Sequence, residues 1–266
     1  MGPFNRVDRY ADEVAGHTTR RSKIGLGFRI AVFFGLPFLV IFTKWNWRGF
    51  EQLSQHDGGI DGGIDGGIIV ATNHTSWFDP LAVAHPLWAH DRPPRFLGKE
   101  SVFRVPIFGW IISSAGQIRV YRESNEAVFA FRDAVVAARS GECVVVYPEG
   151  TITRDPHLWP MQGKTGAVRI ALESGCPLFP MVQWGSQNVI GPYKKQLRLL
   201  PRKTMYVWLG EPIDLSRYRD KEWTPELLHE ATDQLMLTIA RMEGEIRGEA
   251  PPAVLYRHTV NNRSER

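Results

Sequence analysis

Residues 67–80 read GIIVATNHTSWFDP and combine an apolar run with a histidine and an aspartate. The stretch opens with an apolar run of the kind that forms a buried strand. His74 follows the run, and Asp79 comes five residues after it. In open α/β sheets, chemistry usually takes place at the carboxyl ends of strands. A neutral imidazole can take a proton from a hydroxyl, and a neighbouring carboxylate can fix its tautomer. The stretch therefore predicts a base and its orienting carboxylate at a strand end.

The spacing of this pair carries little weight alone. His56 and Asp61 have the same spacing, and they lie in a glycine repeat that is not an active site on any ordinary interpretation. The chain has eight histidines, and such a match arises by chance in about one of every two or three such chains. The segments that follow the pair must therefore decide its meaning.

Three later segments repeat the pattern of a strand joined to special residues. Residues 116–122 read GQIRVYR, an alternating strand that ends in arginine. Residues 144–151 read VVVYPEGT, a buried type of strand that runs into Pro-Glu-Gly-Thr. Residues 175–182 read GCPLFPMV, an apolar run bracketed by prolines. If these strands are parallel, their ends gather at one edge of a sheet.

In this order, the four blocks resemble the glycerophospholipid acyltransferase family, of the 1-acylglycerol-3-phosphate (lysophosphatidic acid) acyltransferase type. The family's blocks read Asn-His-x-Ser-x-x-Asp, Gly-x-x-x-x-x-Arg, Phe-Pro-Glu-Gly-Thr-Arg and a proline-rich hydrophobic run. Residues 96–100 and 106–110 are also similar to the family. The resemblance implies transfer of a fatty acyl group from acyl-CoA or acyl carrier protein to the free hydroxyl of 1-acylglycerol 3-phosphate, which gives phosphatidic acid.

The resemblance and the residue chemistry together suggest roles. His74 would be the base and Asp79 its partner, while backbone amides of the turn Glu149-Gly150-Thr151 would stabilise the thioester oxyanion. Glu149 either anchors its loop or meets the acceptor's hydroxyl. Cations that would bind the acceptor phosphate are Arg122, Lys99, Arg154 and Lys164. Further motif residues, which pack the blocks or contact the acyl chain, are Asn73, Ser76, Trp77, Phe78, Gly116, Pro148 and Pro177.

One position departs from the family pattern. Ile152 stands where the family usually has arginine after Glu-Gly-Thr, which leaves the acceptor head group open. Another lysophospholipid, or a glycolipid such as a mannosylated inositol lipid, is the alternative acceptor, and a non-catalytic lipid-binding protein is the remote alternative. We expect no cofactor and no metal, because no further histidine or cysteine sits at ligand spacing. Cys143 and Cys176 lie in apolar runs and are poor nucleophiles.

The composition favours a membrane partner. The chain of 266 residues has two cysteines and a net charge of +4, and its pI is about 9.1. Few cysteines indicate a reducing compartment, and a basic balance suits an anionic surface. No nucleic-acid partner is expected, because basic residues and exposed aromatics are not interleaved in a stacking pattern.

Residues 24–43 are hydrophobic and form the predicted membrane contact. Their uninterrupted apolar part, residues 30–42, would rise only about 20 Å as a helix, short of the ~30 Å hydrocarbon core. Pro37 would kink that helix. Basic residues flank the segment on both sides, and Trp45 and Trp47 stand at its end. We expect a monotopic anchor on the cytoplasmic face of the cell membrane, with a tilted single span or a buried core helix as alternatives.

The order of elements predicts the fold class. Apolar runs alternate with helical patterns, which predicts an α/β domain with a mostly parallel central sheet flanked by helices and an N-terminal helical membrane anchor. The predicted parts are a polar arm (1–22), a membrane-associating helical motif (23–56), a Gly-rich linker (57–67), a catalytic domain (68–250) and a tail (251–266). Predicted strands are 68–72, 95–98, 117–121, 142–147, 178–183 and 205–209; predicted helices are 81–89, 107–114, 126–139, 166–174 and 224–245.

Overall fold

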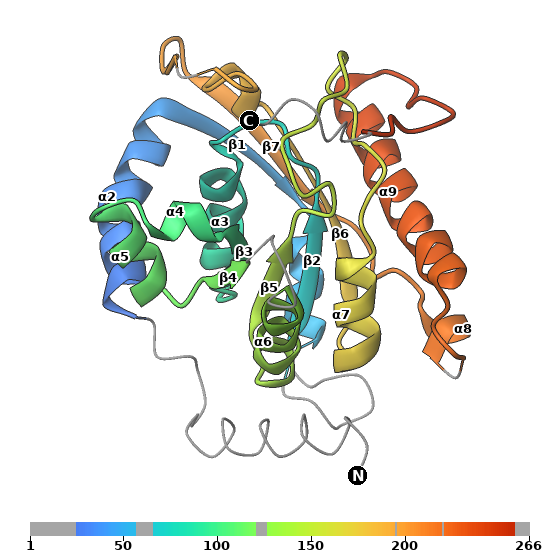
Figure 1. Ribbon diagram of the computed structural model, residues 1–266. Coiled ribbons are helices and arrows are strands. Elements are labelled where there is room, and N and C mark those ends of the chain that lie inside the picture. Colours follow the sequence, from blue (N-terminus) through green and yellow to red (C-terminus); the bar gives the residue numbers. More distant parts are fainter. Residues whose placement is uncertain (1–24, 57–65, 121–126, 195, 220, 259–266) are drawn as a thin grey trace, which may run out of the picture.

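The computed structural model describes residues 25–56, 66–120, 127–194, 196–219 and 221–258. One seven-stranded sheet, in the order β1-β7-β6-β2-β5-β3-β4, forms its centre (Figure 1). Only the β6–β7 pair among these strands is antiparallel. The strands are β1 Thr43–Arg48, β2 Ile68–Thr72, β3 Pro94–Lys99, β4 Ile118–Val120, β5 Cys143–Val146, β6 Leu178–Trp184 and β7 Lys203–Leu209.

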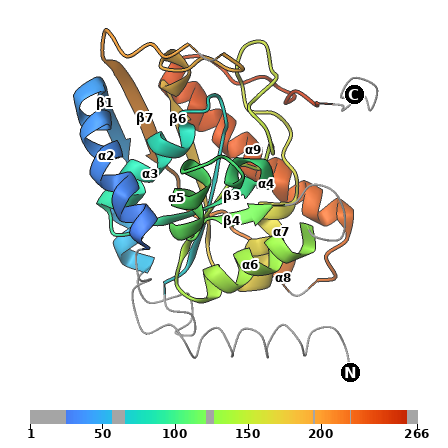
Figure 2. The ribbon, with the colours of Figure 1, turned by 60° about the vertical axis from the view of Figure 1, so that its left-hand side comes forward.

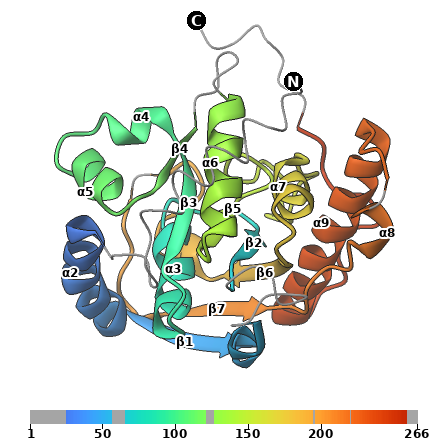
Figure 3. The same ribbon diagram turned by 90° about the horizontal axis from the view of Figure 1, so that it is seen from below.

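Helices cover both faces of this sheet, as Figure 3 shows from below. The predicted α/β architecture with a mostly parallel sheet is therefore confirmed. The helices are α2 Leu26–Phe42, η1 Phe50–His56, α3 Asp79–Ala89, α4 Glu100–Phe103, α5 Phe108–Ser114, α6 Ala127–Arg139, α7 Gly166–Ser174, η3 Ser186–Asn188, α8 Ser216–Arg219 and α9 Pro225–Arg247.

Strand β2 shows how the sequence sets the two faces. Ile69 and Ala71 join the cluster that α6, α7 and α9 cover, whereas Ile68 and Val70 join the cluster under α3 and η1. Side chains alternate between the faces of a strand, so a strand buried on both faces reads as a continuous apolar run. β2 is accordingly buried over its whole length, and it lies between β5 and β6, both parallel to it.

The predicted strands and helices are confirmed, with ends shifted by one or two residues wherever the ends are described. Two helix ends are capped by residues typical of those positions: Thr224 Oγ1 accepts a hydrogen bond from Leu227 N at 3.4 Å, and Gly175 ends α7 with φ +74°.

One strand was not predicted. Residues 43–48, assigned from the sequence to the helical motif, form β1 and pair with β7. The flanking basic residues predict a membrane-interface position for Trp45 and Trp47. That interpretation was wrong, since both rings are half-buried and pack edge-on against His85 of α3, with centroids 4.5 and 4.9 Å away. The sheet domain therefore begins before residue 68.

Helix α2 lies at one end of the molecule beside α5 (Figure 1 and Figure 2). It continues through Pro37 to Phe42. Arg202 satisfies its carboxyl end, because the guanidinium donates to the carbonyls of Val40 and Thr43 at 2.8 and 2.6 Å. Among the helices of the described residues, none has both the length and the apolar character needed to cross a bilayer.

Candidate active site

His74 and Asp79 meet at the carboxyl end of β2. His74 Nδ1 lies 2.7 Å from Asp79 Oδ2, with 13% of the histidine side chain exposed and none of the aspartate. The contact uses Nδ1, and because a carboxylate can only accept a hydrogen bond, Nδ1 carries the hydrogen and donates it to Asp79. Nε2 is therefore left unprotonated in the neutral ring, so it can accept a proton from a bound hydroxyl.

Asp79 is held by more than the imidazole. Its Oδ2 accepts hydrogen bonds from the backbone amides of Thr75 and Ser76 at 2.6 and 2.8 Å. Ser186 from η3 reaches its other oxygen. The carboxylate is also the first residue of α3, where the helix dipole favours negative charge. The loop between β2 and α3 thus wraps around a buried carboxylate and fixes the position of His74.

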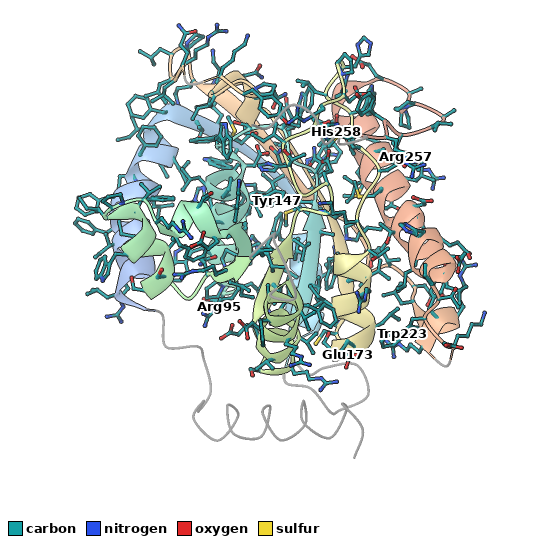
Figure 4. All side chains as sticks on the ribbon, viewed as in Figure 1. Arg95, Tyr147, Glu173, Trp223, Arg257 and His258 are labelled. Atoms are coloured by element: carbon teal, nitrogen blue, oxygen red, sulfur yellow. The ribbon has the colours of Figure 1, made fainter. Side chains whose placement is uncertain are left out.

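Tyr147 covers the imidazole. Its ring stacks on that of His74, with centroids 4.3 Å apart and an interplanar angle of 27°. Figure 4 labels Tyr147 near the upper end of the central strands. Its hydroxyl is buried without a partner within the described residues, and burial, together with the charge of Asp79, raises the pKa of Tyr147 well above its usual value. Tyr147 therefore stays neutral and restricts the ring of His74 to one orientation.

Glu149 joins three segments through its two oxygens. Oε1 accepts the backbone N–H of His74 at 2.9 Å, and Oε2 accepts that of Met161 at 3.1 Å. The side chain is buried. Burial raises the pKa of this carboxyl well above its usual value, and the two amide donors partly offset the rise. The contacts correspond to the loop-anchoring alternative for Glu149.

The turn after β5 limits the oxyanion donors. Gly150 has φ +69°, and its amide donates to the Tyr147 carbonyl at 2.9 Å. The Gly150 N–H therefore cannot also stabilise an oxyanion, which corrects the expectation that the whole turn would serve. The amides of Glu149 and Thr151 have no acceptor within the described residues, and they remain candidates.

Asn73 links the loop to the last helix. Its Nδ2 donates to the Gln183 carbonyl at 3.0 Å and to Glu243 Oε2 at 2.9 Å, while its Oδ1 accepts Gln183 N at 2.9 Å. The whole side-chain amide is thus satisfied in the interior. Glu243 is fully buried, and its other oxygen receives Arg247 Nη1 at 2.9 Å. A carboxylate on α9 thereby holds the residue directly before His74.

Burial raises the pKa of Glu243 to about 8, from an ordinary value of 4.5, against the lowering effect of Arg247 and Asn73. Between these values the folded protein binds a proton that the unfolded chain has lost, so stability falls as pH rises. The contribution is fully present below pH 4.5 and is lost as pH passes about 8. We expect Glu243→Gln to remove this part of the slope, which is about 1.4 kcal/mol per pH unit at most.

Urea unfolding at several pH values would measure that slope in both proteins. Glu245→Gln, two residues away on the same helix, is the matched control because the side chain of Glu245 is exposed, whereas Asn73 bonds to Gln183 and Glu243. An unchanged slope in Glu243→Gln would contradict the assignment.

The predicted phosphate contacts are only partly brought together. Lys164 lies at the turn after β5, because a β-carbon built on Gly150 would be 3.1 Å from its Nζ. Arg154 is exposed, with its guanidinium 5.2 Å from the ring centre of Tyr193. Lys99 is exposed at the end of β3, two strands away from β2. Arg122 lies in residues 121–126, outside the described part of the chain.

Ile152 shows what replaces the family's arginine. Its side chain is only 2% exposed, so this position offers an interior aliphatic group instead of a cation. Its carbonyl accepts the hydroxyl of Tyr193 at 2.5 Å, and the next residue, Thr153, donates its amide to the His74 carbonyl at 2.7 Å. The nearby cations are Lys164 and Arg154.

Some of the remaining motif residues lie beside the active site, and the others lie elsewhere in the domain. Ser76 Oγ donates to the Ile190 carbonyl at 2.6 Å. Phe78 is buried against Leu39 of α2, whereas Trp77 is 60% exposed. Pro148 is buried beside the site, and Gly116 and Pro177 precede β4 and β6 at the opposite edge of the sheet.

Several site residues were not predicted. Tyr147 precedes the Pro-Glu-Gly-Thr block, so its place at a strand end was a usable signal. Gln183 is the last residue but one of β6, and its Nε2 donates to Thr75 Oγ1 at 2.9 Å. Nothing in the sequence connects Glu243 or Ser186 to Asn73 and Asp79, because these pairs are more than a hundred residues apart.

An imidazole held by a buried carboxylate at the carboxyl edge of a parallel sheet defines an α/β protein equipped to take a proton from a bound hydroxyl. Comparison with known proteins gives the family. The family model described as Acyltransferase matches residues 45–184, more than half of the 266 residues. The chain belongs to the acyltransferase family, which confirms the resemblance noted in the sequence.

Individual relatives agree. A chloroplastic 1-acyl-sn-glycerol-3-phosphate acyltransferase from Brassica napus is 26% identical over 56% of this chain and 40% of its own length. The 1-acyl-sn-glycerol-3-phosphate acyltransferase of Salmonella typhimurium is 26% identical over 67% of this chain and 69% of its own. The chain thus spans well under two thirds of the plant protein.

A solved structure supports the fold. The crystal structure of the 1-acyl-sn-glycerophosphate acyltransferase PlsC from Thermotoga maritima aligns with a TM-score of 0.58 and 21% identity, over 92% of this chain and 90% of that one.

Proposed function

We propose that this protein transfers a fatty acyl group from a thioester to the free hydroxyl of 1-acylglycerol 3-phosphate and so forms phosphatidic acid. The observation that carries the proposal is the 2.7 Å contact between His74 and a fully buried Asp79 in a chain of the acyltransferase family. The names of the relatives supply the acceptor class. Acyl-CoA or acyl carrier protein is the proposed donor.

The reaction follows from the geometry of the pair. His74 Nε2 takes the acceptor's hydroxyl proton while Asp79 stabilises the imidazolium. The hydroxyl oxygen attacks the thioester carbonyl, and the tetrahedral intermediate collapses with release of the thiolate. The imidazolium returns the proton to that sulfur, so no acyl-enzyme forms. Burial raises the pKa of the Cys143 thiol to about 12, which is consistent with a direct transfer.

Charge at the site suits an anionic acceptor. The ammonium of Lys164 lies over the turn that follows β5, and the amides of Glu149 and Thr151 are the proposed oxyanion donors. Arg154 is the second proposed phosphate contact, because no acidic side chain is paired with its guanidinium within the described residues.

Membrane association is the second part of the proposal. The exposed face of α2 carries Leu26, Phe33, Val40 and other apolar side chains, while Leu39 on its inner face packs with Phe78 beside Asp79. An apolar helix that touches the catalytic loop would let acceptor and acyl chain enter from the bilayer. We propose monotopic binding at the cytoplasmic face of the membrane.

Thiol release from palmitoyl-CoA by detergent-solubilised protein tests the activity. We expect release only when 1-acylglycerol 3-phosphate is present, with one phosphatidic acid formed for each thiol. Release that does not depend on any acceptor would indicate a thioesterase and contradict acyl transfer. If palmitoyl-CoA gives no release, palmitoyl-acyl carrier protein is the second donor to test, and failure with both donors and all acceptors contradicts the proposal.

The buried Ile152 favours a second acceptor class. An arginine-free motif is compatible with another lysophospholipid or with a glycolipid such as a mannosylated inositol lipid. The same assay with a panel of acceptors separates the cases, because Lys164→Ala should raise KM for a phosphate monoester acceptor and leave KM for an uncharged head group unchanged.

A further inference from the structure

The turn before α5 presents apolar side chains to solvent. Ile107 is 79% exposed, which is the highest value among the exposed large hydrophobic residues of the described chain. Val105, Phe108 and Trp110 beside it are 48%, 50% and 54% exposed. Apolar patches of this kind on a protein surface usually mark a binding face.

The backbone of this turn is strained in a way that produces the exposure. Ile107 has φ +64° and ψ −58°, and Phe108 N donates to the Pro106 carbonyl at 2.7 Å. These values define the rarer, strained form of the γ-turn. A β-branched residue at positive φ is a genuine outlier. Such strain persists where the surrounding structure enforces it, and it gathers at functional sites.

Helix α5 is fixed to α2 by close backbone contact. A β-carbon on Gly25 would lie 1.8 Å from Ser114 O, and one on Gly27 would lie 2.2 Å from Ile111 O. Only glycine permits this approach. The exposed residues of α2 recur at helical spacing on one face, as Leu26, Phe33, Pro37 and Val40 show. The turn and this face therefore belong to one end of the molecule (Figure 1 and Figure 2).

The two segments are also strongly basic. Residues 25–44 and 99–119 contain five basic residues and a single acidic one, Glu100. Glu100 is itself paired with Arg104 at 2.6 Å. The net charge of +4 in these segments equals that of the whole chain. An anionic lipid surface would neutralise this charge, whereas a two-fold contact with a second copy would bring like charges together.

We propose that the turn at residues 105–110 inserts into the interface of an anionic bilayer, beside α2, as a second point of membrane contact. The inference rests on the membrane association proposed above and adds a specific element to it. Two contacts hold the sheet domain in one orientation, with the α2–α5 end toward the lipid. Transfer of the exposed Ile107 side chain from water into the bilayer interface would contribute favourable free energy to membrane binding.

Co-sedimentation with vesicles of phosphatidylcholine and phosphatidylglycerol tests this. Glycine relieves the positive φ, so we expect Ile107→Gly to leave the Tm unchanged or slightly raised while it weakens vesicle binding roughly tenfold, the value expected for one buried isoleucine side chain. Val254→Gly is the matched control, because Val254 is 77% exposed in the segment after α9 on the other side of the molecule (Figure 1). It should bind like the wild type.

Quenching of tryptophan fluorescence by brominated lipids measures how deeply the turn inserts into the bilayer. Trp110→Phe keeps the apolar surface, so binding should persist while quenching of tryptophan emission by lipids brominated on the acyl chain decreases. Vesicle binding by Ile107→Gly equal to the wild type would overturn the inference. So would a loss of self-association in that variant with no change in vesicle binding, which would identify a second copy as the occupant.

If the wild-type protein does not co-sediment with the vesicles, both this inference and the proposed membrane association are wrong. Thiol release measured on the same preparations separates that result from a failure of the acyl-transfer proposal.

Discussion

His74→Ala is expected to lower the rate of acyl transfer at least about 100-fold, the minimum effect of losing a general base, while fold and vesicle binding remain. The imidazole is the group whose Nδ1 faces Asp79 and whose Nε2 is left to accept a proton. Its removal leaves the rest of the loop satisfied, since Asp79 still accepts the amides of Thr75 and Ser76. The backbone N–H of residue 74 would still reach Glu149.

Initial rates of thiol release, together with thermal unfolding, measure this result. His229→Ala is the control, because His229 is exposed on α9. Turnover near the wild-type level in His74→Ala would eliminate His74 as the base.

The second large effect is expected for Asp79→Ala, which should lose both activity and stability. The buried carboxylate receives His74 Nδ1 and the two loop amides, and Ser186 lies against its other oxygen. Alanine leaves these donors without an acceptor in the interior. Removal of one side of such a buried charged network costs about 3–5 kcal/mol. The rate should fall at least as far as in His74→Ala, because the imidazole also loses its orientation.

Urea unfolding measures the stability of Asp79→Ala. Comparison with His74→Ala then separates the loss of the base from the loss of the loop structure. We expect activity alone to fall in the histidine variant and both quantities to fall in the aspartate variant. Ser186→Ala, which removes one donor and no charge, should lie between Asp79→Ala and the wild type in stability. A wild-type urea midpoint for Asp79→Ala would show that the carboxylate does not organise the loop.

Much of this site was predictable because strand ends are visible in the sequence. The run at residues 67–71 is apolar at every position, and such a run is typical of a central parallel strand. The Pro-Glu-Gly-Thr block follows a second such run, and β5 indeed lies next to β2. Parallel neighbours bring their carboxyl ends to one edge, so the proximity of His74 and Glu149 follows from the fold class.

Other features depend on packing that no local pattern encodes. The strand β1 was missed because Trp45 and Trp47, flanked by cations, match the pattern of a membrane interface as well as that of a strand. The roles of Glu149 and Gly150 could not be predicted, because they depend on the hydrogen bonds that these residues form in the folded turn. The contact between Asn73 and Glu243 joins residues 170 positions apart, and periodicity within α9 indicates only that one face is buried.

The tie between Asn73 and α9 has a consequence for where this domain ends. The family match stops at residue 184, and every motif of the resemblance lies before that point. Yet the asparagine that leads into His74 is held by Glu243, and Arg247 braces that carboxylate while its guanidinium lies 3.9 Å from the ring centre of Trp159. A chain that ended at the last motif would keep His74 and Asp79. It would lose Glu243 and Arg247, the two α9 residues that hold Asn73 in position. The support of this site therefore includes residues at least as far along the chain as Arg247.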